Sequence, residues 1–584
     1  KNRPRMLVED IQDIIEQKLM ADGKFVLAKT YIIYRYTREL VRKANTTDDS
    51  ILSLIKNRNK DVMEENSNKN AKILTTQRDY MAGIISTDAT RKYLLSPEIV
   101  QAHDEGIIHF HDADYFAQNA ISNCCLVNLE DMLQNGTCIN KVMIEKPHRL
   151  ITAATIATQI ITAVTSSQYG GATITLTHLA PFVRDSYIYH LNKYRKRKFS
   201  EQDCVKWAKE DLKKEISDAV QTFNYQCNSM STTNGQSPFL SVFMYLGETF
   251  EYKDELSMLI EEFLTQRLIG MKNEVGVYVT PAFPKLIYVL DEHNCLKGGK
   301  YDYLTKLAVK CSAKRMYPDY ISAKKMKENY EGNVFSPMGC RSFLAPWKDE
   351  EGNYKFEGRF NQGVVSINLP QIGIIAQGDE EKFWKLFDER LEICKEALMC
   401  RHYALVGTKS DISPIHWQNG AIARLEKGEK IDKFLYGGYS SISLGYIGIY
   451  ELTKLMKGVS HTTKEGHDFA IKVMKHLNET IEKWKKETNI GFALYGTPAE
   501  SLCYRFARID KEKFGSIPDV TDKGYYTNSY HVDVREKIDA FSKLKFESEF
   551  QPMSQGGAIS YVEVPNMKNN LPALEEVVKY IYDN

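Results

Sequence analysis

Ser336-Pro337-Met338-Gly339-Cys340-Arg341-Ser342 is the stretch around which the rest of the chain is organised. It places one cysteine directly after a Pro-Met-Gly turn, between a polar segment (residues 328–333) and an apolar run (residues 343–347). Proline fixes φ and glycine admits positive φ, so the pattern predicts a rigid turn that presents the Cys340 sulfur for use. A buried structural cysteine is the commoner arrangement for a single cysteine, and other motifs have to decide between the two.

Composition limits the classes of protein that the chain can belong to. Its 584 residues suffice for two or more domains, or for one large α/β barrel. Lys+Arg 77 against Asp+Glu 76 leaves little net charge, which argues against direct binding of nucleic acid or of a membrane surface. No apolar run reaches about 18 residues and residues 1–5 lack the apolar core of a signal peptide, so we expect a cytoplasmic protein.

The cysteines point to the same compartment. There are eleven, with no regular spacing and no C-x-x-C pair, which fits a reducing environment better than a disulfide framework. We therefore expect no structural metal site within this sequence.

Apolar periodicity predicts two kinds of structure. Residues 7–19 and 25–40 show helical spacing, and an Asn/Lys-rich stretch at residues 64–72 reads as a linker. Beyond residue 76, short apolar runs alternate with amphipathic segments, which predicts a mainly parallel α/β architecture with its chemistry at strand ends. The predicted strands are residues 240–246, 286–290, 364–369, 492–495, 529–534 and 559–564, and the predicted helices include residues 150–165, 256–268, 380–398 and 469–487.

A vicinal cysteine pair, Cys124 and Cys125, follows a histidine cluster. Adjacent cysteines seldom bond each other because the ring is strained, so one sulfur is expected to face a site and the other the core. His109 and His111 alternate as on a strand, which suits a metal site or a polar site wall. Without a third soft ligand at a suitable spacing, a metal is the less favoured of the two.

Two Ser/Thr-rich stretches resemble helix entries that bind anions. In the first, Thr497, Ala499, Glu500 and Ser501 lie between an apolar strand and a helical run. Thr or Ser at the cap with proline just inside marks a helix start whose free N–H groups can hold a phosphate.

The second stretch contains Ser443 and Gly445. Either stretch alone reads more simply as a cap, whereas both together favour a phosphorylated ligand. Asn361, predicted to precede a strand, adds an amide that can donate to a substrate hydroxyl. The residues alone thus predict a cytosolic α/β enzyme with accessible thiols and a phosphate site.

Several stretches together resemble the anaerobic (class III) ribonucleotide reductases, which belong to the glycyl radical enzymes. The similarity extends from about residue 64 to the end, and residues 1–40 resemble the C-terminal part of an ATP-cone. The matching stretches are residues 76–79, 106–109, 123–127, 167–171, 314–319, 336–343, 443–449, 497–506 and 527–531.

The resemblance implies a ten-stranded α/β barrel with a central finger loop (residues 46–584), preceded by a small helical ATP-cone remnant (residues 1–45). Cys340 matches the finger-loop cysteine whose thiyl radical removes the 3′-hydrogen of a ribonucleotide. Cys124 matches the cysteine on the opposite face of the substrate, and Met338 and Asn361 match residues beside them.

The remaining site residues follow from the same resemblance. It implies that the stretch containing Thr497, Ala499, Glu500 and Ser501 holds the substrate phosphates, with help from Ser443 and Gly445. His109 is predicted to line the substrate site. An allosteric specificity site, at the dimer interface in this family, is expected near Glu145 and residues 150–165.

The resemblance also implies cofactors and partners. We expect ribonucleoside triphosphates as substrates, formate as reductant, ATP, dATP and dNTP effectors, and a radical-SAM activating enzyme with an iron-sulfur cluster. A homodimer is expected, with a tetramer in the presence of dATP. The family carries its glycyl radical and a four-cysteine structural zinc site on a C-terminal module that has no counterpart in residues 1–584, and the first half of the ATP-cone has none either.

Two other functions are alternatives to a ribonucleotide reductase. A non-catalytic nucleotide-binding regulatory homologue is disfavoured because such a protein has no reason to keep Cys340, Cys124 and Asn361 together. Another glycyl radical enzyme, such as a pyruvate formate-lyase relative, is disfavoured because those enzymes carry adjacent cysteines at the finger tip, whereas Cys340 is single.

Overall fold

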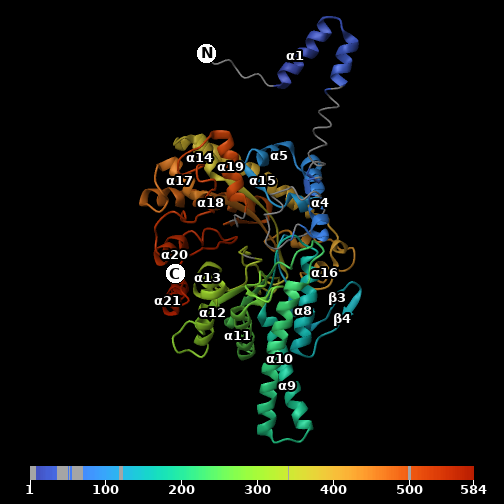
Figure 1. Ribbon diagram of the computed structural model, residues 1–584, viewed down its shortest axis with the longest axis vertical. Coiled ribbons are helices and arrows are strands. Elements are labelled where there is room, and N and C mark those ends of the chain that lie inside the picture. The colour runs from blue at the N-terminus through green and yellow to red at the C-terminus, as the bar shows by residue number, and fades with distance from the viewer. Residues whose placement is uncertain are drawn as a thin grey trace.

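The computed structural model describes residues 8–33, 35, 50, 51, 53, 54, 70, 72–117, 123–339, 341–496 and 501–584. These residues form one large α/β body, preceded by a helical segment (Figure 1). That segment consists of α1 (Val8–Ala21), a turn at Asp22-Gly23 and a second helical run at residues 25–33. Arg35 bridges the two by a 3.0 Å contact with Glu16. The predicted pair of helices is therefore confirmed as far as residue 33, and the rest of the second one lies outside the described residues.

One half of the main sheet is a run of five parallel strands. Each strand is hydrogen-bonded to the next in the order β2-β5-β6-β9-β10. The strands are β2 (Cys125–Leu126), β5 (Ala172–Thr175), β6 (Leu240–Met244), β9 (Lys285–Leu290) and β10 (Asp319–Ser322).

The other half is built on β11 (Arg359–Asn368), β12 (Ser441–Ile447) and β13 (Gly491–Tyr495), which are also parallel. β11 joins the halves because it pairs antiparallel with β2, and it also pairs antiparallel with β1 (Ile108–Phe110). Nine strands thus form one sheet within the described residues. The predicted α/β class is confirmed.

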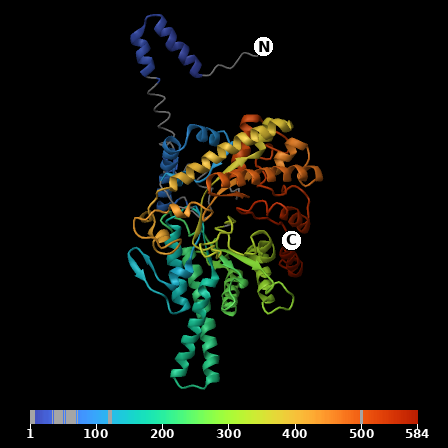
Figure 2. The same cartoon turned by 180° about the vertical axis from the view of Figure 1, so that it is seen from behind.

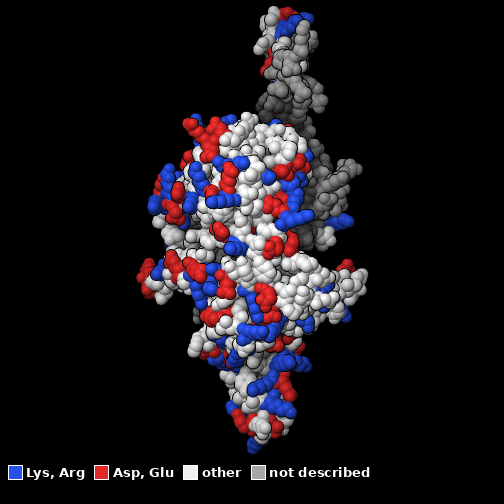
Figure 3. Space-filling view, turned by 90° about the vertical axis from the view of Figure 1, so that its left-hand side faces the viewer, with Lys and Arg blue, Asp and Glu red and all other residues white. Residues whose placement is uncertain are grey.

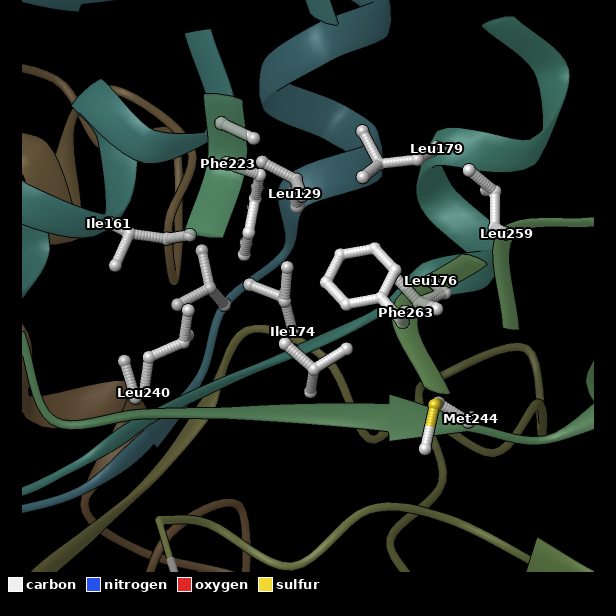
Figure 4. Close-up of a cluster of buried hydrophobic side chains, with 14 of the residues drawn as sticks. Leu129, Ile161, Ile174, Leu176, Leu179, Phe223, Leu240, Met244, Leu259 and Phe263 are labelled. Carbon is white, nitrogen blue, oxygen red and sulfur yellow. The ribbon is translucent and has the colours of Figure 1, made fainter. Parts of the chain in front are cut away.

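Alternating side chains explain why helices cover the outside of this sheet. In β6, Leu240, Val242 and Met244 join a buried cluster with residues of the surrounding helices (Figure 4), whereas Ser241 points to the opposite face. Figures 1 and 2 show the helices following the first half-sheet on one side of the body and those following the second on the other.

Further elements complete the chain. The helices are α4 (Leu74–Ala89), α5 (Pro97–Asp104), α6 (Ala113–Phe116), α7 (Leu129–Gln134), α8 (Leu150–Thr165), α9 (Ala180–Lys196), α10 (Glu201–Ser229), α11 (Lys253–Ile269), α12 (Asp302–Arg315), α13 (Ala323–Asn329), α14 (Leu369–Ala376), α15 (Glu380–Leu405), α16 (Pro414–Trp417), α17 (Ile449–Lys457), α18 (Lys464–Thr488), α19 (Leu502–Phe514), α20 (Ala540–Ser548) and α21 (Leu571–Asp583). Two hairpins pair β3 (Thr137–Ile139) with β4 (Val142–Ile144), and β7 (Met271–Lys272) with β8 (Tyr278–Val279).

Two predicted strands are wrong. Residues 529–534 and 559–564 each contain several Val, Ile or Tyr side chains, but neither segment is a strand. Ser529 has φ of 43°, and the His531 N–H bonds back to the Asn528 carbonyl, so the first segment is a turn. The Ile559 carbonyl accepts hydrogen bonds from the side chains of Tyr530 and His531, where a strand would offer a backbone donor.

The surface and helices bear on the expected environment. None of the helices in the described part of the chain combines the length and apolar character needed to cross a bilayer. Acidic and basic side chains are interspersed over the face drawn in Figure 3. This mixture matches the near-zero net charge of the whole chain.

A buried arginine connects the two half-sheets to the segment that follows the finger loop (residues 336–342). Arg359, at the start of β11, is fully buried and donates to the backbone carbonyls of Tyr439 (2.7 Å), Gly438 (2.8 Å), Ala345 (2.9 Å) and Lys355 (3.1 Å). Burial lowers the pKa of Arg359 to about 10, so the guanidinium stays charged at neutral pH. Its planar fork of five N–H groups is what allows one side chain to reach four carbonyls.

We predict that Arg359→Lys destabilises the protein by on the order of 3 kcal/mol, because one ammonium cannot replace the fork and buried carbonyls lose their donors. The apparent Tm and the urea midpoint would report the loss. Arg195→Lys is the matched control, since Arg195 is half-exposed and pairs with Glu201 at the surface. Equal midpoints for the two variants would contradict the role given to Arg359.

Candidate active site

The finger loop is held against the interior face of the first half-sheet. The Thr173 hydroxyl, on β5, donates to the Pro337 carbonyl (2.8 Å) and accepts from the Gly339 N–H (3.0 Å). Ser241, on β6, donates to the Gly339 carbonyl. Gly339 has φ of 60°, so glycine is needed for the tight turn that the sequence predicted there. Cys340 itself lies outside the described residues.

The exit of the loop is held from the other side. The Phe343 N–H donates to the Gly556 carbonyl (2.9 Å), and the Gly556 N–H donates to Leu494 on β13 (2.7 Å). A Cβ on Gly557 would lie 1.7 Å from the Arg341 carbonyl oxygen, so no side chain fits there. The loop is therefore clamped between β5 and β6 on one side and a C-terminal segment beside β13 on the other.

The two adjacent cysteines face different surroundings, as the strain of a vicinal disulfide predicts. The half-buried Cys124 sulfur accepts from the Gly171 N–H (3.2 Å) and donates to the Asn123 side-chain oxygen (3.4 Å). A Cβ on Gly339 would lie 3.5 Å from this sulfur, so Cys124 faces the finger loop one residue before position 340. Cys125 is fully buried and donates to Gln168 (3.2 Å), and burial raises the pKa of its thiol.

Asn361 lies beside Cys124. Its backbone N–H donates to the Cys124 carbonyl (2.9 Å), and its side-chain amide donates to Ser441 (3.0 Å) and Ser443 (2.9 Å) on β12. Met338 is buried against Leu126 and Leu344 in a small cluster that also includes Cys124. Cys124, Met338, Asn361 and Ser443 are thus brought to one interior region.

Two local predictions about this region are wrong. Asn361 was expected before a strand and Ser443 at a helix entry, but both lie inside strands, on β11 and β12. α17 begins only at Ile449, after Gly448. Gly445 pairs with Ser366 and Tyr495 within the sheet. Serine and glycine occur here because the interior face of a tightly packed sheet takes small side chains.

A cluster of three histidine side chains lies at the other end of β11. The His109 ring is 4.5 Å from His111 and 5.0 Å from His103, centre to centre, and lies edge-on to Phe506 of α19. Burial lowers the pKa of all three histidines, to about 3 for His103 and His111 and well below the ordinary value for His109. The imidazoles are therefore neutral at physiological pH and act as hydrogen-bonding groups.

Two arginines supply positive charge to this cluster. Arg505 donates to the His103 carbonyl and Arg401 to the His111 carbonyl. Burial lowers the pKa of Arg505 to about 10, which leaves it charged. His109 Nδ1, Arg505 Nη1 and Arg401 Nε are buried and have no hydrogen-bond partner among the described residues. Buried polar atoms without partners are rare, and an anion would satisfy the two arginine N–H groups, joined by His109 Nδ1 in the tautomer that carries its proton there.

The other predicted site residues are placed as follows. Thr497, Ala499 and Glu500 lie outside the described residues. Ser501 directly precedes α19, so the predicted helix after this stretch is confirmed. Glu145 is exposed in the link between β4 and α8. The described residues contain no group of three or more His, Cys, Asp or Glu side chains arranged to hold a metal.

The sequence did not single out Thr173, Gln168, Arg401 or Arg505. Arg505 follows Ser501 by one helical turn, so a helix-entry pattern could have indicated it. Arg401 lies more than a hundred residues away from any other member of the cluster, within α15, and only the packing of α15 on β11 reveals it.

Comparison with known proteins gives consistent matches. The family model described as anaerobic ribonucleoside-triphosphate reductase matches residues 65–584, and the ATP cone domain model matches residues 1–40. The chain is 39% identical to the anaerobic ribonucleoside-triphosphate reductase of Escherichia coli (strain K12) over 594 residues, covering all of this chain and 82% of that protein. It is 41% identical to the enzyme of the same name from enterobacteria phage T4 over 544 residues, covering 92% of this chain and 87% of that protein.

Among solved structures, the anaerobic ribonucleotide reductase from Thermotoga maritima in complex with dATP and CTP superposes with a TM-score of 0.64 at 16% identity. The match covers all of this chain and 90% of that one. At this identity the likeness shows a shared fold, and the fold predicted by resemblance, an α/β barrel with a central finger loop, is confirmed.

We predict that Thr173→Val loosens the finger loop, because the Gly339 N–H and the Pro337 carbonyl lose their shared partner. At about 1 kcal/mol for each hydrogen bond, amide exchange at residues 336–339 should become roughly thirtyfold faster. Hydrogen exchange followed by mass spectrometry measures this rate. Thr173→Ser keeps the hydroxyl and is the control. Unchanged protection in Thr173→Val would show that other contacts hold the loop.

Proposed function

The chain belongs to the anaerobic ribonucleoside-triphosphate reductase family and carries an ATP cone match at its N-terminus, and from this premise we propose a thiyl radical reductase that uses formate as its reductant. Its substrates are ribonucleoside triphosphates and its products are the 2′-deoxyribonucleoside triphosphates. The observation that carries the proposal is the position of the Cys124 sulfur, beside Gly339 at the tip of the finger loop and next to Asn361.

In this proposal, Cys340 and Cys124 approach the ribose from opposite faces. The thiyl radical at Cys340 takes the 3′-hydrogen and becomes a thiol, and the 2′-hydroxyl leaves as water with a proton supplied by Cys124. Formate provides the two electrons for reduction at the 2′-carbon and is oxidised to CO₂, after which the hydrogen held by Cys340 returns to the 3′-carbon and restores the thiyl radical. The glycyl radical of the family would supply the oxidising equivalent to Cys340. The hydrogen bonds that hold the Cys124 sulfur and the finger loop up to Gly339 favour such chemistry, since hydrogen transfer requires reacting atoms to be held in contact and away from water.

Asn361 and Met338 border the same space. The Asn361 amide is oriented by Ser441 and Ser443, so its geometry is fixed before a substrate arrives. Met338 contributes a polarizable, apolar wall beside the reacting sulfurs. We propose that these two residues shape the ribose and formate site, and that Ser443 and Gly445 help to hold the substrate phosphates, as the resemblance implies.

The triphosphate is proposed to bind at the start of α19, at the stretch that contains Thr497, Ala499, Glu500 and Ser501. A helix N-terminus offers free N–H groups to an anion. Arg505 lies in the first turns of this helix and His109 packs against Phe506 of the same helix, while Arg401 contacts the neighbouring His111 carbonyl; their unpartnered polar atoms support the assignment. Because the histidines are neutral, the arginines supply the charge.

Regulation and assembly are proposed from the family. The ATP cone match supports allosteric control by nucleotides, with ATP activating and dATP inhibiting, and a separate specificity site is proposed near Glu145 and α8. A radical-SAM enzyme with an iron-sulfur cluster is the proposed activator. The proposed assembly is a homodimer that becomes a tetramer with dATP, and the proposed location is the cytoplasm.

The central experiment replaces the three cysteines one at a time in the full-length enzyme. Cys340→Ser and Cys124→Ser should abolish formation of deoxynucleotide while nucleotide binding persists, because a hydroxyl cannot relay a radical at accessible energies. Cys125→Ala should keep most activity, since this sulfur faces the core. Omission of formate should stop turnover in the unmodified enzyme. Normal turnover in Cys340→Ser, or equal losses from Cys124→Ser and Cys125→Ala, would refute the assignment.

A second prediction concerns the triphosphate. Arg505→Gln should raise the KM for ribonucleoside triphosphate by about tenfold to a hundredfold, the effect of losing one charged hydrogen bond. Arg508→Gln, which alters an exposed arginine on the same helix, should leave the KM unchanged. Steady-state kinetics and calorimetric titration with the triphosphate provide the two measurements. A wild-type KM in Arg505→Gln would remove Arg505 from the phosphate site.

A further inference from the structure

The turn at Gly170 and Gly171 is fully hydrogen-bonded and touches both proposed reactive segments. The Gly170 N–H donates to the Asn123 carbonyl (2.8 Å) and the Gly171 N–H to the Cys124 sulfur (3.2 Å). A Cβ on Gly170 would lie 2.6 Å from that sulfur, and one on Gly171 would lie 2.7 Å from the Gly339 Cα. The backbone of this turn therefore fills the space between Cys124 and the finger loop, and only glycine allows so close an approach.

Gln168 fixes the turn from behind. Its side chain is almost fully buried, and its amide nitrogen donates to the carbonyls of Gly170 (3.2 Å) and Gly171 (2.9 Å). Its oxygen accepts from the Cys125 thiol (3.2 Å) and lies 3.0 Å from His416 Nε2. The nitrogen and the oxygen of the Gln168 amide thus each have two partners, so the side chain has one orientation.

His416 sets which end of the Gln168 amide points at the turn. Burial lowers the pKa of His416 to about 3, so the ring is neutral and carries one N–H. That proton sits on Nε2, because Gln168 offers only an oxygen there and the Ser413 hydroxyl can donate to Nδ1 at 2.7 Å. An imidazole N–H facing Gln168 holds its oxygen inward and turns its NH₂ group toward the two glycine carbonyls.

We propose that Gln168, oriented by His416, is a positioning residue for Cys124: it holds the Gly170–Gly171 turn so that the Gly171 N–H stays on the Cys124 sulfur. The inference deepens the proposed function and depends on it for the role of Cys124. The N–H fixes the direction of the sulfur toward the finger loop and stabilises its thiolate form. Gln168 does not touch the substrate in this arrangement and acts through the backbone.

The test uses the full-length enzyme and iodoacetamide as the probe, with alkylation of each cysteine read by peptide mass spectrometry. Gln168→Met keeps the size of the side chain and removes its hydrogen bonds. Loss of one hydrogen bond to a thiolate should raise the pH midpoint of Cys124 alkylation by about one unit, which is a tenfold slower reaction below that midpoint. In turnover, kcat should fall while the KM for the triphosphate stays the same.

A second variant separates positioning from general loss of structure. Gln168→Glu keeps an oxygen toward Cys125 and His416, and its carboxyl can donate to the turn only when protonated. Its Cys124 reactivity and kcat, relative to the unmodified enzyme, should therefore recover as the pH falls, whereas those of Gln168→Met should not. Gln418→Met is the matched control, because the Gln418 side chain bonds to Ser410 and has no hydrogen bond to the Gly170–Gly171 turn among the described residues, so both readouts should stay unchanged.

Each outcome decides between the alternatives. Alkylation of Cys124 at the unmodified rate and an unchanged kcat in Gln168→Met would overturn the inference. Equal slowing of Cys124 and of Cys138, a thiol on β3 away from the turn, would also overturn it, because that pattern indicates a general change in structure. If Cys124→Ser remained active, the proposed function would fail, but a shifted alkylation midpoint would still establish that Gln168 positions the sulfur.

Discussion

The shared hydrogen bonds of the Thr173 hydroxyl are the constraint on which the interior of this protein depends. One oxygen atom accepts from Gly339 and donates to Pro337, and so joins a loop to a strand more than 160 residues earlier. A loop inside a sheet carries backbone groups that no helix or ladder satisfies. Thr173, Ser241 and Gly556 satisfy them one by one, and the result is an interior loop with a defined conformation.

Buried cations show how the chain handles charge inside this body. Among the described residues Arg359 forms no ion pair with a carboxylate and is held by four carbonyl dipoles, whereas the buried Lys523 pairs with Glu451 and with Asp533 (2.6 Å). Both arrangements compensate the desolvation of the cation, since every nitrogen of the two cationic groups has a hydrogen-bond partner. Arg401 and Arg505 differ, because each retains a buried N–H without a partner among the described residues. Incomplete compensation is unfavourable for a structural arginine and suited to one that meets an anion.

The sequence predicted the parts of this structure whose signal is local. The helix at residues 150–165 has the same bounds in the structure, because a long apolar stripe at helical spacing suffices to define it. The same approach failed for residues 529–534 and 559–564, where Val, Ile and Tyr residues occur in loops and the Ile559 carbonyl accepts hydrogen bonds from side chains. It also placed Ser443 at a helix entry instead of on β12, because small residues occur both at helix entries and on the interior face of a strand.

The site shows the same division more sharply. The sequence predicts a rigid loop from Pro337 and Gly339, and it predicts from the vicinal cysteines that their two sulfurs face different surroundings. Both predictions succeed because turn geometry and ring strain are local properties. Which sulfur faces the loop is a different question, decided by contacts with Gly171 and Gln168 across the sheet. Their environments then differ: burial raises the pKa of Cys125, while the half-buried Cys124 sulfur accepts a hydrogen bond from the Gly171 N–H. Two adjacent cysteines thus become one inert and one available thiol through the register of a single strand, because a shift of one residue would exchange their places.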